Sequence, residues 1–147
     1  MTERIAIFPG SFDPFTLGHH SIVERGLNLF DKIIIAIGYN EQKQVSDNID
    51  KRLSVIKEIY AGNNNVEVIS YSGLTVECAK RHNARFILRG VRNFIDFEYE
   101  RNLAEINRKV GNIETILLFT LPEHGAISSS MVRELQHNGV DVRDFLP

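Results

Sequence analysis

Tryptophan is absent from the 147 residues of the chain, and Cys78 is its single cysteine. One cysteine cannot form an internal disulfide, which suits a reducing compartment, so we expect a cytoplasmic protein. No stretch approaches the ~18 consecutive apolar residues of a membrane span, and the N-terminal RIAIF follows no apolar segment of signal-peptide length. The net charge is only -2, which offers little to a nucleic acid or a membrane surface. We therefore expect no nucleic acid and no membrane among the partners.

Short apolar runs alternate with helical patterns along the chain. The runs predict five strands, at Arg4–Phe8, Lys32–Gly38, Val66–Ser70, Arg85–Arg89 and Glu114–Phe119. Runs such as KIIIAIG are continuous and β-branched, which is typical of strands that are buried on both faces of a parallel sheet. The length suits one domain, residues 1–147. We expect an α/β fold with a doubly wound, Rossmann-like, five-stranded parallel sheet and helices on both faces.

The loop after the first predicted strand reads PGSFDPFTLGHH, residues 9–20. In open α/β sheets ligands bind beyond the carboxyl ends of the strands, so this loop is a candidate binding segment. Gly18 opens a predicted helix, and the free N–H groups at a helix N-terminus favour phosphate. His19 then projects from the first turn. A lone histidine at such a position is more often structural, but Thr16, Gly18 and His19 together after a strand favour a functional role.

A second candidate segment, ISSSMVRE, covers residues 127–134. Its serines precede an amphipathic helix and can each serve as an N-cap, which is the structural alternative. Three serines in succession exceed what one cap needs. Arg133 in the first turn opposes the helix dipole unless an anion lies at that end. Two helix N-termini, after Gly18 and near Ser130, can therefore hold one triphosphate from two sides.

These segments resemble a known family. Thr16–His19 is similar to the T/HxGH motif of the nucleotidyltransferase α/β phosphodiesterase superfamily, and GSFDPFTLGH resembles the opening of bacterial phosphopantetheine adenylyltransferases. ISSSMVRE resembles the ISSS/T-x-x-[KR]E signature of that family. RGVRNFIDFEYE, residues 89–100, resembles the segment that separates the family from its relatives. The three motifs occur in the expected order and span most of the chain.

The resemblance implies roles for individual residues. The catalytic group that it implies is His19, Lys43 and Arg89. The nucleotide-binding residues that it implies are Ser11, Phe12, Gly18, His19, Gly90, Val91, Arg92, Glu100, His124, Gly125, Ala126, Ile127, Ser128, Ser129 and Ser130. The residues that it implies for the acceptor substrate are Ser11, Lys43, Leu74, Thr75 and Arg89. The alternatives are a surface lysine at position 43 and, for Arg89, an ion pair with Asp96 or Glu98.

The implied reaction transfers AMP from ATP to 4'-phosphopantetheine, which yields dephospho-coenzyme A and pyrophosphate. The acceptor phosphate attacks the α-phosphorus in line, so no covalent intermediate and no protein nucleophile is required. Mg²⁺ would bridge the ATP phosphates, since no carboxylate cluster offers a protein cage. We also expect the helix N-terminus to keep His19 neutral, as a hydrogen-bond donor. The resemblance further implies a homohexamer.

Two other functions stay open at this point. Nicotinamide-mononucleotide adenylyltransferases share a GSFDP-like opening and an ISST-like second motif, although the short chain and the RGVRNFIDFEYE segment weigh against them. A regulatory module that binds ATP without chemistry would need the adenosine contacts but not His19, Lys43 and Arg89 together.

Overall fold

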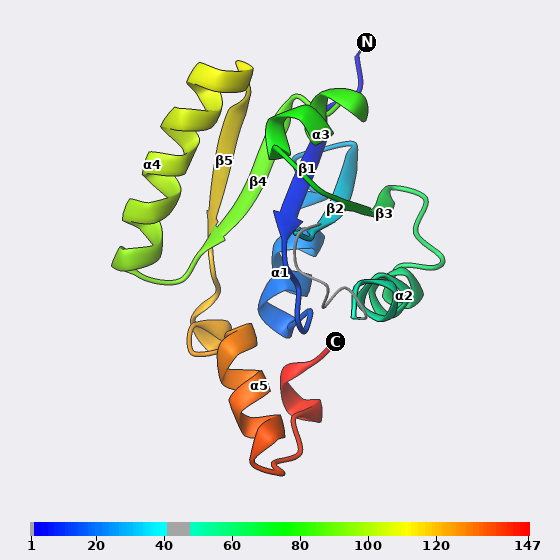
Figure 1. Cartoon of the computed structure of the whole chain (residues 1–147), viewed down its shortest axis with the longest axis vertical. Coiled ribbons are helices and arrows are strands. Elements are labelled where there is room, and N and C mark those ends of the chain that lie inside the picture. The colour runs from blue at the N-terminus through cyan, green and yellow to red at the C-terminus, as the bar shows by residue number, and fades with distance from the viewer. Residues whose placement is uncertain (1, 41–47) are drawn as a thin grey trace.

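The computed structural model describes residues 2–40 and 48–147. Its centre is a sheet of five parallel strands in the order β3-β2-β1-β4-β5, which confirms the predicted fold (Figure 1). The strands are β1 (Ile5–Gly10), β2 (Lys32–Gly38), β3 (Val66–Tyr71), β4 (Phe86–Val91) and β5 (Glu114–Phe119). The chain adds β2 and β3 on one side of β1, then crosses to add β4 and β5 on the other. The strand order therefore reverses between β1 and β4.

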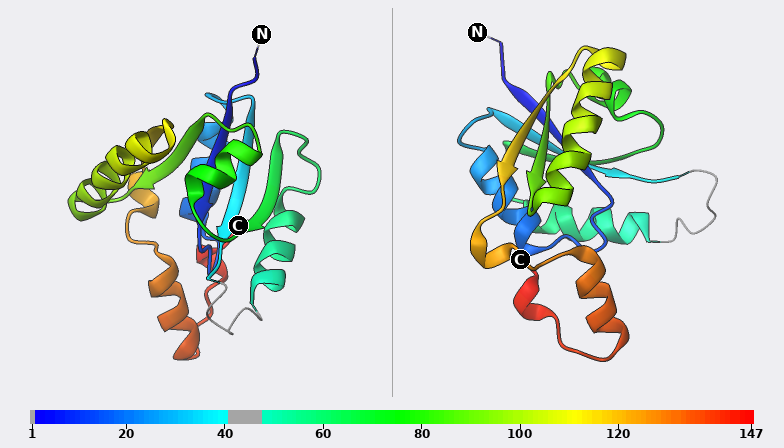
Figure 2. Two further views of the ribbon diagram at one scale, coloured as in Figure 1. Left: turned by 45° about the horizontal axis from the view of Figure 1, so that its top comes forward. Right: turned by 90° about the vertical axis from the view of Figure 1, so that its left-hand side faces the viewer.

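Helices cover both faces of this sheet (Figures 1 and 2). They are α1 (Leu17–Gly26), α2 (Ile49–Ile59), α3 (Thr75–Arg81), α4 (Phe94–Gly111) and α5 (Ser129–His137), with 3-10 turns at Pro122–His124 and Arg143–Phe145. Successive side chains of a strand point to opposite faces. In β2, Ile33, Ile35 and Ile37 accordingly pack with α1 and α2, whereas Ile34 and Ala36 pack with α3.

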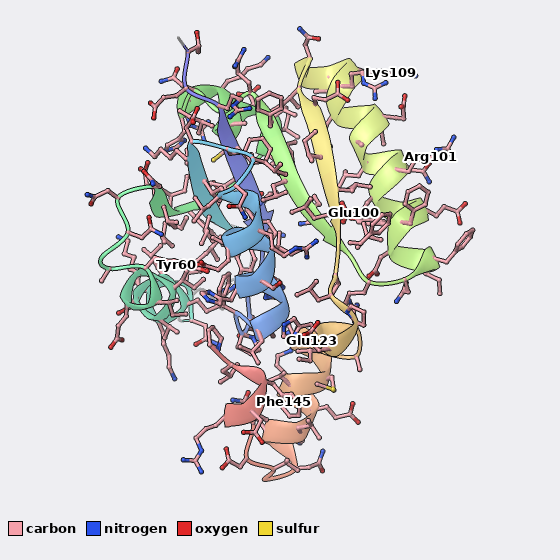
Figure 3. The ribbon with its side chains drawn as sticks, turned by 180° about the vertical axis from the view of Figure 1, so that it is seen from behind. Tyr60, Glu100, Arg101, Lys109, Glu123 and Phe145 are labelled. Atoms are coloured by element: carbon pink, nitrogen blue, oxygen red, sulfur yellow. The ribbon has the colours of Figure 1, made fainter. Side chains whose placement is uncertain are left out.

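The segment after β5 lies beyond the carboxyl ends of the strands, below the strand arrows in Figure 1. This segment holds α5 and both 3-10 turns, which are marked by Glu123 and Phe145 in Figure 3. It therefore lies at the edge of the sheet where a ligand is expected.

The strands β1 and β4 are joined over a short stretch only. Among the described residues they pair at Ala6–Phe86 and Ile7–Ile87, whereas β1 and β2 stay paired as far as Gly10. The predicted end of the first strand at Phe8 was therefore too early, because pairing with β2 carries β1 through Pro9 and Gly10. Pro9 has no N–H to donate, which suits a position where β4 is no longer a partner. The separation of these two strands provides room for a site.

The outer face of α4 carries large apolar side chains. Phe94 and Ile95 are 82% and 80% exposed, and Tyr99, Ile106 and Val110 are exposed as well. Along the part of the chain that the structure describes, no helix has the length and apolar character that crossing a membrane would require.

Candidate active site

A cavity of about 230 Å³ lies where the strand order reverses. Its walls come from the loop after β1, the first turn of α1, the end of β4 and the segment before α5. The lining residues are Phe8, Pro9, Gly10, Ser11, Phe12, Thr16, Gly18, His19, Ile22, Arg89, Gly90, Arg92, Thr120, Ile127, Ser128 and Ser129. Both motif segments, more than a hundred residues apart in sequence, therefore meet at one cavity.

Thr16 is the N-cap of α1 and orients the imidazole of His19. The Thr16 hydroxyl accepts a hydrogen bond from the backbone N–H of His19 at 3.4 Å. In return the backbone N–H of Thr16 donates to Nδ1 of His19 at 2.9 Å. Because Nδ1 is an acceptor here, the proton of the neutral ring is on Nε2. His19 is thereby prepared to donate a hydrogen bond from Nε2.

Three phenylalanine rings surround the His19 imidazole. The centroid distances are 5.0 Å to Phe12, 5.4 Å to Phe15 and 6.3 Å to Phe8. Burial, together with the positive charges of Arg89 and Arg92, lowers the pKa of His19 to about 4. His19 is neutral near pH 7, as expected, but the main cause is the loss of hydration rather than the helix N-terminus.

Phe12 has a backbone conformation that side chains rarely adopt. Its φ is 48°, in the left-handed region, and its ring is 3% exposed. The ring lies against Gly10, where an added Cβ would come within 2.9 Å of it. Gly10 is therefore required for close packing, and the loop holds the Phe12 ring between the strand end and His19.

Arg89 projects from β4, which continues to Val91, two residues beyond the predicted end of the strand, and its side chain reaches Pro9 of β1. Its Nε donates to both carboxylate oxygens of Glu100 at 3.0 Å, and its Nη2 donates to Oε1 at 2.6 Å. Nη1 donates to the carbonyl oxygen of Pro9 at 2.5 Å. The structural alternative for Arg89 was an ion pair, and the structure has one, but with Glu100 rather than with Asp96 or Glu98. The backbone N–H and side chain of Arg92 occupy Asp96 instead, and Arg89 pairs with the buried Glu100.

The N-terminus of α5 faces the same cavity. Ser128 is its N-cap, and its hydroxyl accepts from the N–H of Met131 at 3.1 Å. Ser129 donates instead to the carbonyl oxygen of Pro14 at 2.7 Å. One serine is thus a cap, as the structural alternative held, and the next serine ties α5 to the loop after β1.

Arg133 connects the same helix to the loop. Its Nη1 donates to the Asp13 carbonyl oxygen at 2.6 Å, and its Nη2 donates to the Ser130 hydroxyl at 3.1 Å. Because α5 begins at Ser129, Arg133 lies just beyond the first turn that the sequence predicted for it, and its side chain is engaged with the loop that lines the cavity.

A second cavity of about 180 Å³ lies on the other side of Arg89. Its lining residues are Pro9, Gly10, Tyr71, Thr75, Ile87, Arg89, Tyr99, Glu100, Leu103, Ala104, Asn107 and Thr115. Tyr71 and Thr75 are joined through their hydroxyl groups at 2.8 Å. The Thr115 Oγ1 atom is buried and has no hydrogen-bond partner. Arg89 therefore forms part of the wall of two neighbouring cavities.

The structure brings most of the predicted site residues to these two cavities. Those at the first cavity are Ser11, Phe12, Gly18, His19, Arg89, Gly90, Arg92, Ile127, Ser128 and Ser129. Those at the second cavity are Thr75, Arg89 and Glu100. Predicted residues that line neither cavity are Leu74, Val91, His124, Gly125, Ala126 and Ser130. Lys43 lies outside the described residues, and the ligand contacts of all these residues remain predictions.

Several lining residues were not among the predicted site residues. Thr120 directly follows β5, so the rule that ligands bind beyond strand ends already pointed to it. Tyr99 and Asn107 line the second cavity from α4, and nothing in their spacing distinguishes them from other residues of that helix. Within residues 2–40 and 48–147 no group of three or more His, Cys, Asp or Glu side chains is arranged to hold a metal ion.

Comparisons with known proteins place the chain in a family. Residues 7–135 match the family described as cytidylyltransferase-like. The phosphopantetheine adenylyltransferase of Bacteroides thetaiotaomicron is 51% identical over 144 residues, 98% of this chain and 95% of the relative. That of Porphyromonas gingivalis is 50% identical over 147 residues, 100% of this chain and 96% of the relative.

A solved structure supports the fold alone. The Vibrio parahaemolyticus protein described as a nicotinate-nucleotide adenylyltransferase has a TM-score of 0.66 and 22% identity, and the match covers 99% of this chain and 94% of the other. The identities near 50% over whole chains are the stronger finding. Together with the motifs gathered at the cavity, they mean that this chain belongs to the phosphopantetheine adenylyltransferase family.

Proposed function

We propose that this chain transfers the adenylyl group of ATP to 4'-phosphopantetheine and releases pyrophosphate. The observation that carries the proposal is the position of Arg89, whose guanidinium borders both cavities. A transfer between two substrates requires that their reacting phosphates meet at one point. Arg89 marks that point, with room for the nucleotide on one side and for the acceptor on the other.

The first cavity is suited to the triphosphate of ATP. The N-termini of α1 and α5 both border it, and each contributes the partial positive charge of a helix end. Arg92 lies on the same wall, and its guanidinium, which pairs with Asp96 at 3.3 Å, is a further cation there. The sequence-based roles of the remaining nucleotide-binding residues, from Ser11 to Ser130, belong to this proposal.

The second cavity is suited to the pantetheine arm. Among the described residues that line it, Arg89 and Glu100 are the charged ones, and they neutralise each other as an ion pair. Leu103 and Ala104 provide apolar surface, and Tyr99 and Asn107 provide hydrogen-bonding groups. This combination matches an arm made of amide groups and short alkyl segments, and the phosphate of that arm would lie toward Arg89.

The chain's own groups act in this reaction by positioning and by stabilising charge. His19 donates a hydrogen bond from Nε2 to the α-phosphate as negative charge develops there. Its low pKa means that the ring donates without being protonated first. Arg89 holds the acceptor phosphate, and Lys43 is proposed as a further cation at the reacting phosphates. Mg²⁺ would be held by the ATP phosphates and would neutralise part of their charge, since no carboxylate is among the described residues that line the first cavity.

Two further features belong to the same proposal. The resemblance implies a homohexamer, and the exposed Phe94, Ile95 and Phe97 side chains of α4 support burial against another copy. A cytoplasmic location agrees with an enzyme that uses ATP and has one buried, free cysteine, Cys78.

The test measures pyrophosphate release from magnesium-ATP with 4'-phosphopantetheine and, in a parallel reaction, with nicotinamide mononucleotide. We expect release only with phosphopantetheine, together with dephospho-coenzyme A in equal amount. Release only with the mononucleotide would overturn the acceptor but keep the chemistry. If ATP binds and neither acceptor reacts, the chain is an ATP-binding regulatory module instead.

A further inference from the structure

Arg52 lies in α2, outside all three sequence motifs, and yet it contacts the loop that lines the first cavity. Its Nη1 donates a hydrogen bond to the carbonyl oxygen of Ser11. Its Nε donates to the carbonyl oxygen of Asn48, one turn earlier, at 3.3 Å. The second bond fixes the direction of the guanidinium, so that the first bond holds the loop from a rigid helix.

The contact with Ser11 restrains the next residue as well. The peptide bond between Ser11 and Phe12 is trans, so its C=O and N–H point in opposite directions. Holding the Ser11 oxygen toward α2 therefore fixes the whole peptide plane that precedes Phe12. Phe12 is the residue whose φ is 48°, a backbone conformation that is unfavourable for a residue with an aromatic side chain.

The Phe12 ring transmits this restraint to His19. The two rings are nearly perpendicular, with centroids 5.0 Å apart. If the peptide plane turned and Phe12 relaxed to a negative φ, its ring would leave the space above Gly10 and beside His19. The half-buried imidazole would then lose part of its apolar surroundings and become more hydrated. The direction of the Ser11 carbonyl is thus linked to the surroundings of the residue proposed to act on the α-phosphate.

We propose that Arg52 is a positioning residue, which holds the Ser11 carbonyl oxygen and thereby keeps Phe12 in its left-handed conformation against His19. The inference rests on the proposed function for its effect on catalysis, but the contact itself belongs to the free protein. Arg52 is not among the residues that line either cavity, so it acts on the site through the loop that its guanidinium holds. The fork of donors on arginine makes both bonds at once, which the single amine of lysine cannot do.

The experiment compares Arg52→Gln and Arg52→Lys with Lys51→Gln, a control that removes the same charge from the neighbouring exposed position of α2. Turnover and KM are measured for both substrates. In parallel the His19 titration is followed by NMR in the free proteins. For Arg52→Gln we expect turnover to fall about tenfold with little change in KM, since small misplacements of reacting groups are costly. We expect the His19 pKa to rise from about 4 toward its ordinary value. In Arg52→Lys both changes, the fall in turnover and the rise in the His19 pKa, should be smaller. Lys51→Gln should show neither change.

The outcomes separate positioning from other roles. An unchanged His19 titration in Arg52→Gln would overturn the proposal, whatever happens to activity. A rise in the KM for ATP that Arg52→Lys abolishes would also overturn it, because charge alone would then suffice. If Arg52→Gln does not fold, Arg52→Lys carries the same titration test. Failure of the proposed function is distinguishable, because it would appear as a wild-type protein without pyrophosphate release while the NMR comparison still stands.

Discussion

The two cavities share Arg89 but differ in what their other walls offer a ligand. No acidic residue is among the described residues that line the first cavity. Two helix N-termini and the side chain of Arg92 border this cavity instead. The second cavity contains Glu100, which pairs with Arg89, together with uncharged side chains. The same arginine therefore borders a positive environment on one side and a neutral one on the other. Under the proposed function, this one side chain would separate the site of an anion from that of an uncharged arm.

Burial explains how this contrast is maintained. The side chain of Glu100 is 5% exposed and that of Arg89 is 26% exposed, so the ion pair that joins α4 to β4 is largely buried. Figure 3 labels Glu100 on α4. Neither charge could stay there alone, because an unpaired buried charge is costly. The pair therefore acts as a partition, and each cavity can be perturbed without the other.

Breaking the Arg89–Glu100 ion pair should have the largest effect on stability and turnover. Arg89→Gln leaves the Glu100 carboxylate buried without a cation, which we expect to cost about 3 kcal/mol of unfolding free energy and to abolish measurable turnover. A double variant, Arg89→Met with Glu100→Leu, should recover most of the stability, because both charges are gone. It should recover no turnover. Urea unfolding and pyrophosphate release check both statements, and an active double variant would refute the role of Arg89.

His19→Ala should affect the first cavity alone. Loss of one preorganised donor typically lowers turnover by ~10²–10³-fold. The KM for phosphopantetheine should stay near the wild-type value, because His19 does not line the second cavity. His137→Ala, at the exposed end of α5, is the matched control. Turnover within threefold of wild type in His19→Ala would contradict the proposed chemistry.

The sequence predicted the sheet, the reversal of strand order and most of the first cavity. β2 and β5 have the predicted bounds, because each is a continuous apolar run that stops at the sheet edge. The partner of Arg89 could not be predicted in this way. Asp96 and Glu100 are one turn apart on the same face of α4, so helical phase does not distinguish them. Which of the two carboxylates pairs with Arg89 depends on their positions along the helix axis, and these positions relative to Arg89 depend on how α4 packs on the sheet.

The neutral state of His19 was predicted, but from the wrong cause, because its main cause also depends on tertiary packing. The sequence indicated a helix N-terminus, which is a local feature. The enclosure by Phe8, Phe12 and Phe15, and the approach of Arg89 from β4, depend on the turn of the loop and on tertiary packing. Arg52 was missed because its contact with Ser11 links a helix to a loop 41 residues away.

The enclosure of His19 also predicts how stability depends on pH. Its folded-state pKa of about 4 lies below the unfolded value near 6.5, so the unfolded chain binds a proton first as pH falls. The contribution of His19 to the free energy of unfolding is present above pH 6.5 and is lost as the pH falls from 6.5 to 4. Between pH 7 and 5 we expect a loss of about 2 kcal/mol. Other groups titrate in this range too, so urea unfolding of the wild type is compared with His19→Gln. Equal losses in the two proteins would show that His19 is not the cause.

The substitution with the smallest expected effect on stability and KM is at Thr115 in the second cavity. The Thr115 Oγ1 atom on β5 is buried without a partner, so Thr115→Val should raise the unfolding free energy by about 1 kcal/mol. If the hydroxyl meets a polar group of the acceptor, the KM for phosphopantetheine should rise about fivefold while that for ATP stays unchanged. Thr115→Ser keeps the hydroxyl and should keep the wild-type KM. A change in the KM for ATP instead would mean that the two cavities are not separated by Arg89, since Thr115 borders only the second.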